Sequence, residues 1–140
     1  MDSKKNSFWT PIIVIALLGT VFAMIVARPL FREPPADLKL GHVNESTFLQ
    51  EVLESEVPVL VDFYADWCGP CQQLAPVLEE LAAELPDAKI VKVNVDENPA
   101  LSRQYGISSI PNLLVFKDGQ IATNHVGLAT KAELKAMLTQ

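Results

Sequence analysis

The stretch that decides the fold is residues 57–71, which read Val-Pro-Val-Leu-Val-Asp-Phe-Tyr-Ala-Asp-Trp-Cys-Gly-Pro-Cys. Its first part, Val57–Tyr64, is an almost unbroken apolar run, which is typical of a central strand covered on both faces. A helix is predicted to follow over Pro70–Leu85, where Pro76 indicates a kink. Its apolar stripe comprises Leu74, Val77, Leu78, Leu81 and Leu85. The stretch therefore predicts a buried strand that leads into a helix, with two cysteines at the junction.

Outward from this stretch, the hydrophobic periodicity alternates between strand and helix. Further strands are predicted at 38–43, 89–95, 112–116 and 120–126, and further helices at 46–54, at 99–105 and after Thr130. The helix at 46–54 is expected to turn one apolar face to the core, made by Phe48, Leu49, Val52 and Leu53. A hairpin turn is predicted at 117–119, and Thr130 with Glu133 forms a capping box. The order β-α-β-α-β-α-β-β-α predicts an α/β fold with one mixed central sheet and helices on both faces.

An apolar segment near the N-terminus precedes this pattern. Residues 6–27 carry no charge, and 16 of the 20 residues from Phe8 to Ala27 are apolar. As a helix these residues would rise about 30 Å, the thickness of a bilayer's hydrocarbon core. The alternatives are a cleaved signal peptide with a small-residue site at 21–23, and a buried globular helix. We expect a basic tail at 1–7, a transmembrane anchor at 8–27, a proline-rich linker at 28–37 and a domain at 38–140.

The charges predict an orientation and exclude one class of partner. Lys4, Lys5 and the terminal amine slightly outweigh Arg28 and Arg32, so the positive-inside rule places the N-terminus in the cytoplasm. The domain is then expected on the extracytoplasmic, or periplasmic, side of an inner (cytoplasmic) membrane that the chain crosses once. Residues 36–140 hold seven basic and 15 acidic groups. This balance excludes a nucleic-acid binder, which needs clustered basic charge. Separately, we expect the domain to be monomeric.

The chain has two cysteines, Cys68 and Cys71, and their spacing at the start of a helix is that of a dithiol that can close on itself. A structural bridge explains them poorly, because such a bridge gains most by closing a long loop. A zinc site would need two more ligands, and the available candidates, His42 and His125, lack the spacing of a ligand pair. The pattern therefore indicates redox chemistry without a metal.

The helix start also predicts different roles for the two cysteines. Cys68 falls at the N-terminal edge, where unpaired amides and the positive end of the helix dipole stabilise a thiolate. We expect Cys68 to be exposed and to attack a substrate disulfide. Cys71 lies one turn inside and is expected to be shielded and to resolve the mixed disulfide. Pro70 suits the first turn, because its missing N–H would have had no partner there.

Asp62 interrupts the apolar run and is therefore expected to be buried, where its pKa should rise. It has two possible roles. One is a satisfied core carboxylate that pairs with Lys92 on the neighbouring strand. The other is a proton acceptor for Cys71 when the resolving thiol attacks. In either case Lys92 is expected to moderate the pKa of the carboxyl group.

Five runs of this sequence together resemble the thioredoxin family: Val61–Cys71, Lys92–Asp96, Gly106–Pro111, Phe116–Gly119 and Val126–Gly127. They follow in order through residues 38–140, so the resemblance implies a thioredoxin-like fold. Asp62 matches the buried aspartate of the family, and Lys92 matches its lysine neighbour. Two departures bear on substrate preference: Tyr64 stands where many members have tryptophan, and Asn112 where threonine is common.

The resemblance also implies a substrate-binding surface. The isomer of the Pro111 peptide bond cannot be read from the sequence, but the resemblance implies that it is cis and that Pro111 faces the dithiol. A flat apolar surface is implied to receive the substrate backbone, formed by Trp67, Gly69, Pro70, Ile110, Pro111 and Gly127.

The implied function is that of a membrane-tethered protein-disulfide reductase. Its substrates would be protein disulfides, its electron donor a membrane carrier or a thioredoxin-reductase-type protein, and its only redox group the Cys68–Cys71 pair, with no cofactor. An oxidase or isomerase of the same fold is one alternative, but Gly69-Pro70 between the cysteines resembles reducing members. The other alternative is a non-catalytic docking module that uses the apolar surface alone.

Overall fold

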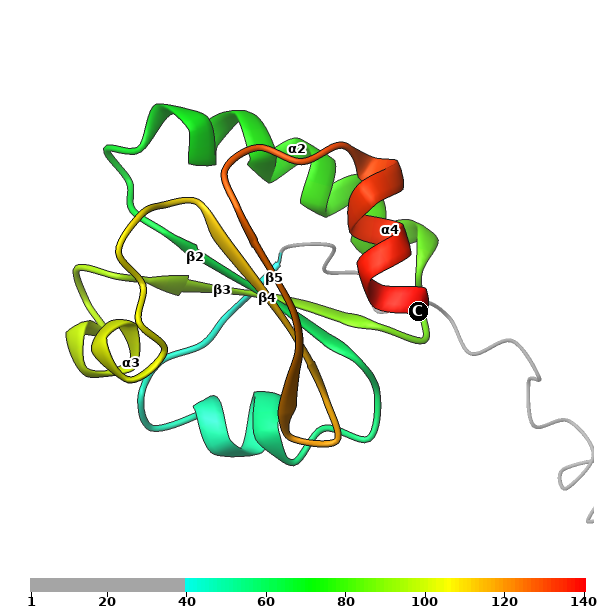
Figure 1. The fold of residues 1–140 in the computed structure, drawn as a ribbon, viewed down its shortest axis with the longest axis horizontal. Helices are drawn as coiled ribbons and strands as arrows, with labels where there is room; N and C mark the ends of the chain where they lie inside the picture. The colour runs from blue at the N-terminus through cyan, green and yellow to red at the C-terminus, as the bar shows by residue number, and fades with distance from the viewer. Residues whose placement is uncertain (1–39) are drawn as a thin grey trace, which may run out of the picture. The chain divides into compact units, whose positions relative to one another are not determined.

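A five-stranded sheet forms the centre of the part of the chain that the structure, a computed structural model, describes, namely residues 40–140 (Figure 1). Its strands are β1 (Gly41–His42), β2 (Val59–Tyr64), β3 (Lys89–Asn94), β4 (Asn112–Lys117) and β5 (Gln120–Val126). The predicted tail, anchor and linker at 1–37 lie outside the described residues. Within residues 40–140, no helix has both the length and the apolar character needed to cross a membrane.

Strand β2 lies at the middle of the sheet, whose order is β1-β3-β2-β4-β5. It pairs in parallel with β3 and antiparallel with β4, while β1 pairs in parallel with β3 and β5 pairs antiparallel with β4. All six residues of β2 are buried, as its apolar run predicted for a strand covered on both faces. The predicted mixed sheet is confirmed.

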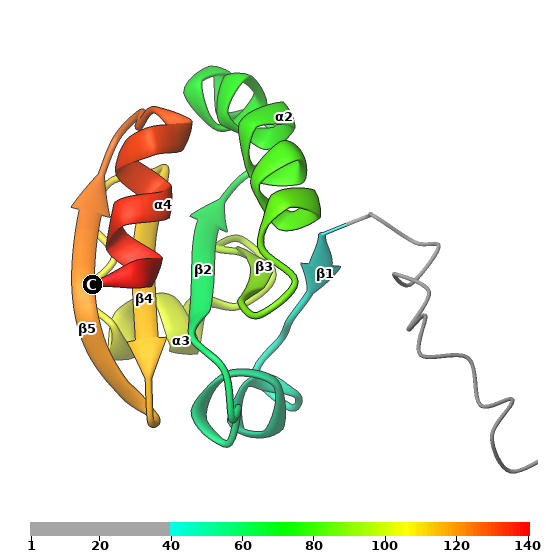
Figure 2. The same cartoon turned by 90° about the vertical axis from the view of Figure 1, so that its right-hand side faces the viewer.

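Helices cover both faces of this sheet (Figures 1 and 2). On one face, α2 (Gly69–Glu84) and α4 (Lys131–Thr139) pack their buried leucines against Leu60 and Leu113. On the other face, η1 (Leu49–Leu53) and α3 (Pro99–Gln104) pack against Val59, Val61 and Phe63. Because successive side chains of a strand point to opposite faces, Asp62 and Tyr64 lie on the α2 face with Leu60.

The helix predicted at 46–54 forms in a different register. It is a π-helix, in which the Glu54 amide donates to the Leu49 carbonyl at 2.9 Å. Phe48 and Val52 are buried, but Leu49 is exposed, so its predicted place on the core face was wrong. In so short a helix, Phe48 and Val52, four residues apart, occupy the side that faces the sheet, and Leu49 falls beside them toward solvent.

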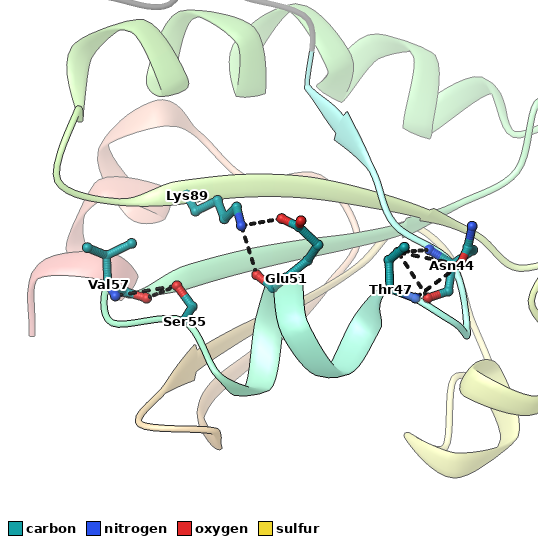
Figure 3. A network of polar contacts seen from close by, with 6 residues as sticks. All are labelled: Asn44, Thr47, Glu51, Ser55, Val57 and Lys89. Atoms are coloured by element: carbon teal, nitrogen blue, oxygen red, sulfur yellow. Dashed lines mark hydrogen bonds and ion pairs between the residues drawn. The ribbon is translucent and has the colours of Figure 1, made fainter.

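Polar contacts hold η1 just before its start and at its middle (Figure 3). At its start, the Asn44 Oδ1 accepts from the Thr47 amide at 3.2 Å, and the Thr47 hydroxyl accepts from the Asn44 amide at 3.1 Å. At its middle, the Lys89 ammonium donates to the carboxylate of Glu51 and, at 3.1 Å, to its carbonyl. Since Lys89 is the first residue of β3, this contact links η1 to the edge of the sheet where β3 begins.

The C-terminal part follows its predicted local signals. Asp118 and Gly119, with φ of 52° and 73°, form the turn between β4 and β5, as a two-residue hairpin requires. A Cβ on Gly119 would lie 2.8 Å from the Leu53 carbonyl oxygen, so the turn also packs closely against η1. The predicted capping box at the start of α4 is confirmed, because the side chains of Thr130 and Glu133 each accept from the other's backbone amide.

Candidate active site

The two cysteines form a disulfide where β2 has turned into α2. Cys68 is the N-cap of α2, and its Sγ accepts from the Cys71 amide at 3.2 Å. Pro70 occupies the first turn, and the two Cα atoms lie 5.3 Å apart. The predicted placement of Cys68 at the helix edge and of Cys71 one turn inside is confirmed. A thiolate on Cys68 would accept from the free amides of this turn, which favours its ionised form.

The expected difference in exposure between the cysteines is wrong for this disulfide form. Cys68 is 4% exposed and Cys71 is 2% exposed, so both are buried. They belong to one small apolar cluster with Tyr64 and Ala65, against which Val95 and Ile110 pack. Val95 and Ile110 come from segments far from Cys68 in the sequence, and no local pattern predicts that they pack against its cluster. What distinguishes the two cysteines is their place relative to the helix amides.

The Ile110–Pro111 bond is cis, as the resemblance implied. Pro111 is buried, and its carbonyl accepts from the Gly127 amide at 2.8 Å. Gly127 has a φ of 97°, a conformation that side chains disfavour, and space is open around its Cα. Because Ile110 packs on the cysteine cluster, this contact brings Pro111 and Gly127 to the neighbourhood of the disulfide.

Apolar side chains border the disulfide on the surface. Trp67 is 71% exposed, and its Nε1 donates to the Asp96 carboxylate at 2.8 Å, which orients the indole ring. Gly69 and Pro70, which follow Cys68, are also exposed. Val126 and Leu128, one on each side of Gly127, are also exposed apolar residues, and the substrate surface expected from the sequence did not include them. The available signal was an apolar pair flanking a glycine at the end of a sheet-edge strand.

Asp62 is completely buried on the α2 face of β2. Neither of its carboxylate oxygens has a hydrogen-bond partner among the described residues. Burial raises the pKa of this carboxyl group from 3.8 to about 7, and the positive charge of Lys92 opposes that rise. The group therefore exchanges a proton near neutral pH, as a general acid or base must.

The alternative role for Asp62, a carboxylate paired with Lys92, is wrong. The two residues are register partners on β2 and β3, yet they form no ion pair. The Lys92 ammonium instead lies 3.9 Å from the centre of the Tyr64 ring. A long side chain can reach several neighbours, and strand pairing alone does not decide which one it takes.

The two histidines are far from forming a metal site. His42 lies on β1 and His125 on β5, which are the opposite edges of the sheet. Each has a contact of its own, His42 with the Tyr64 hydroxyl at 3.2 Å and His125 with the Leu128 carbonyl at 3.1 Å. In residues 40–140, no three His, Cys, Asp or Glu side chains gather as metal ligands would.

The buried carboxyl group predicts how stability depends on pH. Between pH 3.8 and about 7, native Asp62 keeps a proton that the unfolded chain releases, so stability falls as pH rises through this range. Asp62→Asn removes this dependence. The unfolding free energy of the variant, relative to the unsubstituted protein, should increase from pH 4 and level off above pH 7. There the difference in Asp62 pKa between the folded and unfolded states corresponds to roughly 4 kcal/mol. Guanidinium unfolding of the oxidised protein measures it, and a gain equal at pH 4 and pH 8 would contradict the assignment.

Comparison with known proteins places this site in a family. Residues 39–140 match the family model described as Thioredoxin. The chain is 57% identical over 93 residues to Thioredoxin 1 of Synechococcus elongatus, an alignment that covers 66% of this chain and 87% of that protein. It is 55% identical over 99 residues to Thioredoxin 1 of Nostoc sp., which covers 70% of this chain and 92% of that protein.

A more distant relative gives the same result. Thioredoxin of Haemophilus influenzae is 47% identical over 100 residues, an alignment that covers 71% of this chain and 94% of that protein. Residues 39–140, which the family model matches, include the disulfide, the buried carboxyl group and the cis-proline described above. The chain therefore belongs to the thioredoxin family and is a thiol-disulfide oxidoreductase of the protein-disulfide reductase class.

Proposed function

We propose that this chain is a membrane-tethered protein-disulfide reductase whose domain acts on the extracytoplasmic side. The observation that carries the chemical part is a disulfide at the start of α2, on the same sheet face as a buried carboxyl group without a hydrogen-bond partner. The tether rests on the sequence of residues 8–27. In the proposed roles Cys68 attacks, Cys71 resolves, and Asp62 accepts the proton of Cys71.

The reaction begins with the reduced dithiol. The Cys68 thiolate attacks one sulfur of a substrate disulfide, so that a mixed disulfide forms and one substrate thiolate leaves. Asp62 takes the proton from the Cys71 thiol, and the resulting thiolate attacks the Cys68 sulfur. The mixed disulfide breaks, the second substrate thiolate leaves, and the Cys68–Cys71 disulfide forms. Two electrons have passed to the substrate, and its thiolates take protons from solvent.

The helix start supports the order of these steps. An anion at the Cys68 sulfur lies at the positive end of α2, where the Cys71 amide already donates to that sulfur at 3.2 Å. Cys71 does not occupy the helix start, so its thiol needs a base to become a thiolate. The Asp62 carboxyl group, with a pKa of about 7, can act as this base. At neutral pH part of it is ionised and ready to accept a proton, and its affinity for that proton is higher than that of an ordinary carboxylate.

The surface around the disulfide supports an extended polypeptide as the substrate. The exposed face of the indole ring of Trp67, together with Gly69 and Pro70, borders one side of the cysteine pair. Ile110, Pro111 and Gly127 come from the loop before β4 and the end of β5, and space is open around the two glycines. An apolar border with room for backbone accepts many sequences, as a general disulfide reductase requires.

The electron donor is proposed by chemical class only. The disulfide formed in each cycle must receive two electrons, from a reductase-type protein or from a membrane carrier. A domain on the extracytoplasmic side would depend on the membrane carrier, because that space is oxidising. The non-catalytic docking role has no comparable support, since it leaves the disulfide and the buried Asp62 unexplained.

The first prediction from these roles concerns trapping. Cys71→Ser should accumulate substrates as stable mixed disulfides with Cys68, because no thiol remains to resolve them. Cys68→Ser should accumulate at least about tenfold less, since Cys71 lies away from the helix edge. Non-reducing electrophoresis with mass spectrometry measures both, and the double serine variant is the control. Equal trapping by the two single variants would overturn the order of attack.

A second prediction concerns the proton acceptor. Asp62→Asn should leave formation of the mixed disulfide nearly unchanged but slow its resolution about tenfold near pH 7. The defect should shrink as pH rises, because a growing fraction of the Cys71 thiol then ionises without a base. Single-turnover kinetics with a peptide disulfide separates the two steps. Asp118→Asn removes the same charge from an exposed turn and should change neither step. A pH-independent defect in Asp62→Asn would indicate another role.

The third prediction tests the tether and its orientation. The full chain should stay in the membrane fraction after an alkaline wash, and added protease should digest the domain in intact spheroplasts. A chain that lacks residues 8–27 should be recovered in the soluble fraction. A shortened soluble form of the full chain would show cleavage instead of anchoring. Protection of the domain in sealed spheroplasts would reverse the orientation without affecting the redox roles.

A further inference from the structure

Three side chains of the α2 face lie in one row across adjacent strands. His42 on β1 is the register partner of Lys92 on β3, and Lys92 is the register partner of Asp62 on β2. The three strands lie side by side, with β3 between β1 and β2 (Figure 2). Register partners share a face of the sheet, so the row brings an imidazole, an ammonium and a carboxyl group together. An ion pair between Lys92 and Asp62 would be the expected outcome.

Tyr64 changes that outcome. It lies two residues after Asp62 on β2 and therefore on the same face. Its hydroxyl and the Nδ1 of His42 are 3.2 Å apart, and the Lys92 ammonium lies 3.9 Å from its ring centre. The same side chain is buried in the cysteine cluster beside Cys68 and Cys71. Tyr64 thus contacts two members of the row and leaves the third, Asp62, without a partner.

We propose that Tyr64 is a positioning residue that holds the Lys92 ammonium on its ring and so keeps it from pairing with the Asp62 carboxylate. Packing in the cysteine cluster holds the ring in place, and the contact of its hydroxyl with His42 is not needed for the ring to hold Lys92. This inference rests on the proposed function, because it explains how Asp62 stays free to accept the Cys71 proton.

Desolvation explains why the ring is a competitive site for the ammonium. Lys92 is only half-buried, whereas Asp62 has no exposed surface. A move toward Asp62 would strip water from the ammonium, and a buried ion pair recovers that loss only with good geometry and further hydrogen bonds. On the ring, the ammonium gains a cation–π contact and keeps part of its water.

Few other charged groups act on Asp62 directly. Its antiparallel partner on β4 is the apolar Leu113, and the buried face of α2 offers Cys71 and leucines. Burial, and to a lesser extent the carboxylates of Asp66 and Glu97, raise the pKa of the Tyr64 hydroxyl. The tyrosine is therefore neutral at physiological pH and acts on Lys92 through its ring. Lys92 is the cation whose position tunes Asp62.

The test compares Tyr64→Leu with Tyr64→Phe in the full chain, each with Lys92 and with Lys92→Met. The Asp62 carboxyl titration is followed by ¹³C NMR. Tyr64→Leu removes the ring, so Lys92 should approach Asp62 and lower its pKa by about one unit. Tyr64→Phe keeps the ring and should stay within about 0.3 units of the unsubstituted protein. With Lys92→Met, Tyr64→Leu should have no effect.

Three results would overturn the proposal. They are an unchanged Asp62 titration in Tyr64→Leu, an equal shift with Lys92→Met, and a Tyr64→Phe variant that behaves like Tyr64→Leu. If Tyr64→Leu does not fold, Tyr64→Met, whose unbranched side chain adapts its shape to the vacated space, tests the same point. The Asp62 titration reports the effect of Tyr64 without depending on catalytic turnover. An unchanged pH profile in Asp62→Asn would refute the proton-acceptor role while leaving the Tyr64 result intact.

Discussion

Strand β2 is buried along its whole length, and the rest of the domain is arranged around that burial. Two faces without solvent require two layers of helices, and α2 with α4 and η1 with α3 supply them. The end of β2 then leads, through a three-residue turn, to the N-cap of α2. The position of Cys68 at a helix start is thus a consequence of the strand's position at the centre of the sheet.

The same burial gives the site its titratable group. Asp62 occupies a position that a leucine or valine would fill more stably, and its carboxyl oxygens have no hydrogen-bond partner among the described residues. An unpaired carboxyl group in such a place destabilises the native state when it ionises, so its pKa rises to about 7. A group that weakens the fold at neutral pH while matching the needs of proton transfer is typical of a functional site.

Much of this was predictable because the signals are local. Burial of Asp62 followed from its place in an apolar run, and the roles of Thr130 and of the Asp118–Gly119 turn followed from short-range capping and turn chemistry. The register of η1 was not predictable, since one helical turn satisfies several hydrogen-bonding patterns at similar energy. The burial of Cys68 was missed because Val95 and Ile110, which pack against its cluster, come from later segments of the chain.

By itself, the sequence determined the order of strands and helices, the position of the dithiol at the start of α2, and the presence of a carboxyl group inside the central strand. These follow from hydrophobic periodicity and from chemistry within a few residues. Only the tertiary structure decided where the Lys92 ammonium lies. Asp62 and the Tyr64 ring are both within its strand neighbourhood, and the choice depends on how much water each leaves around the charge. The amount of water left around the ammonium depends on how β1, β2, β3 and α2 pack together, so it is a property of the tertiary structure.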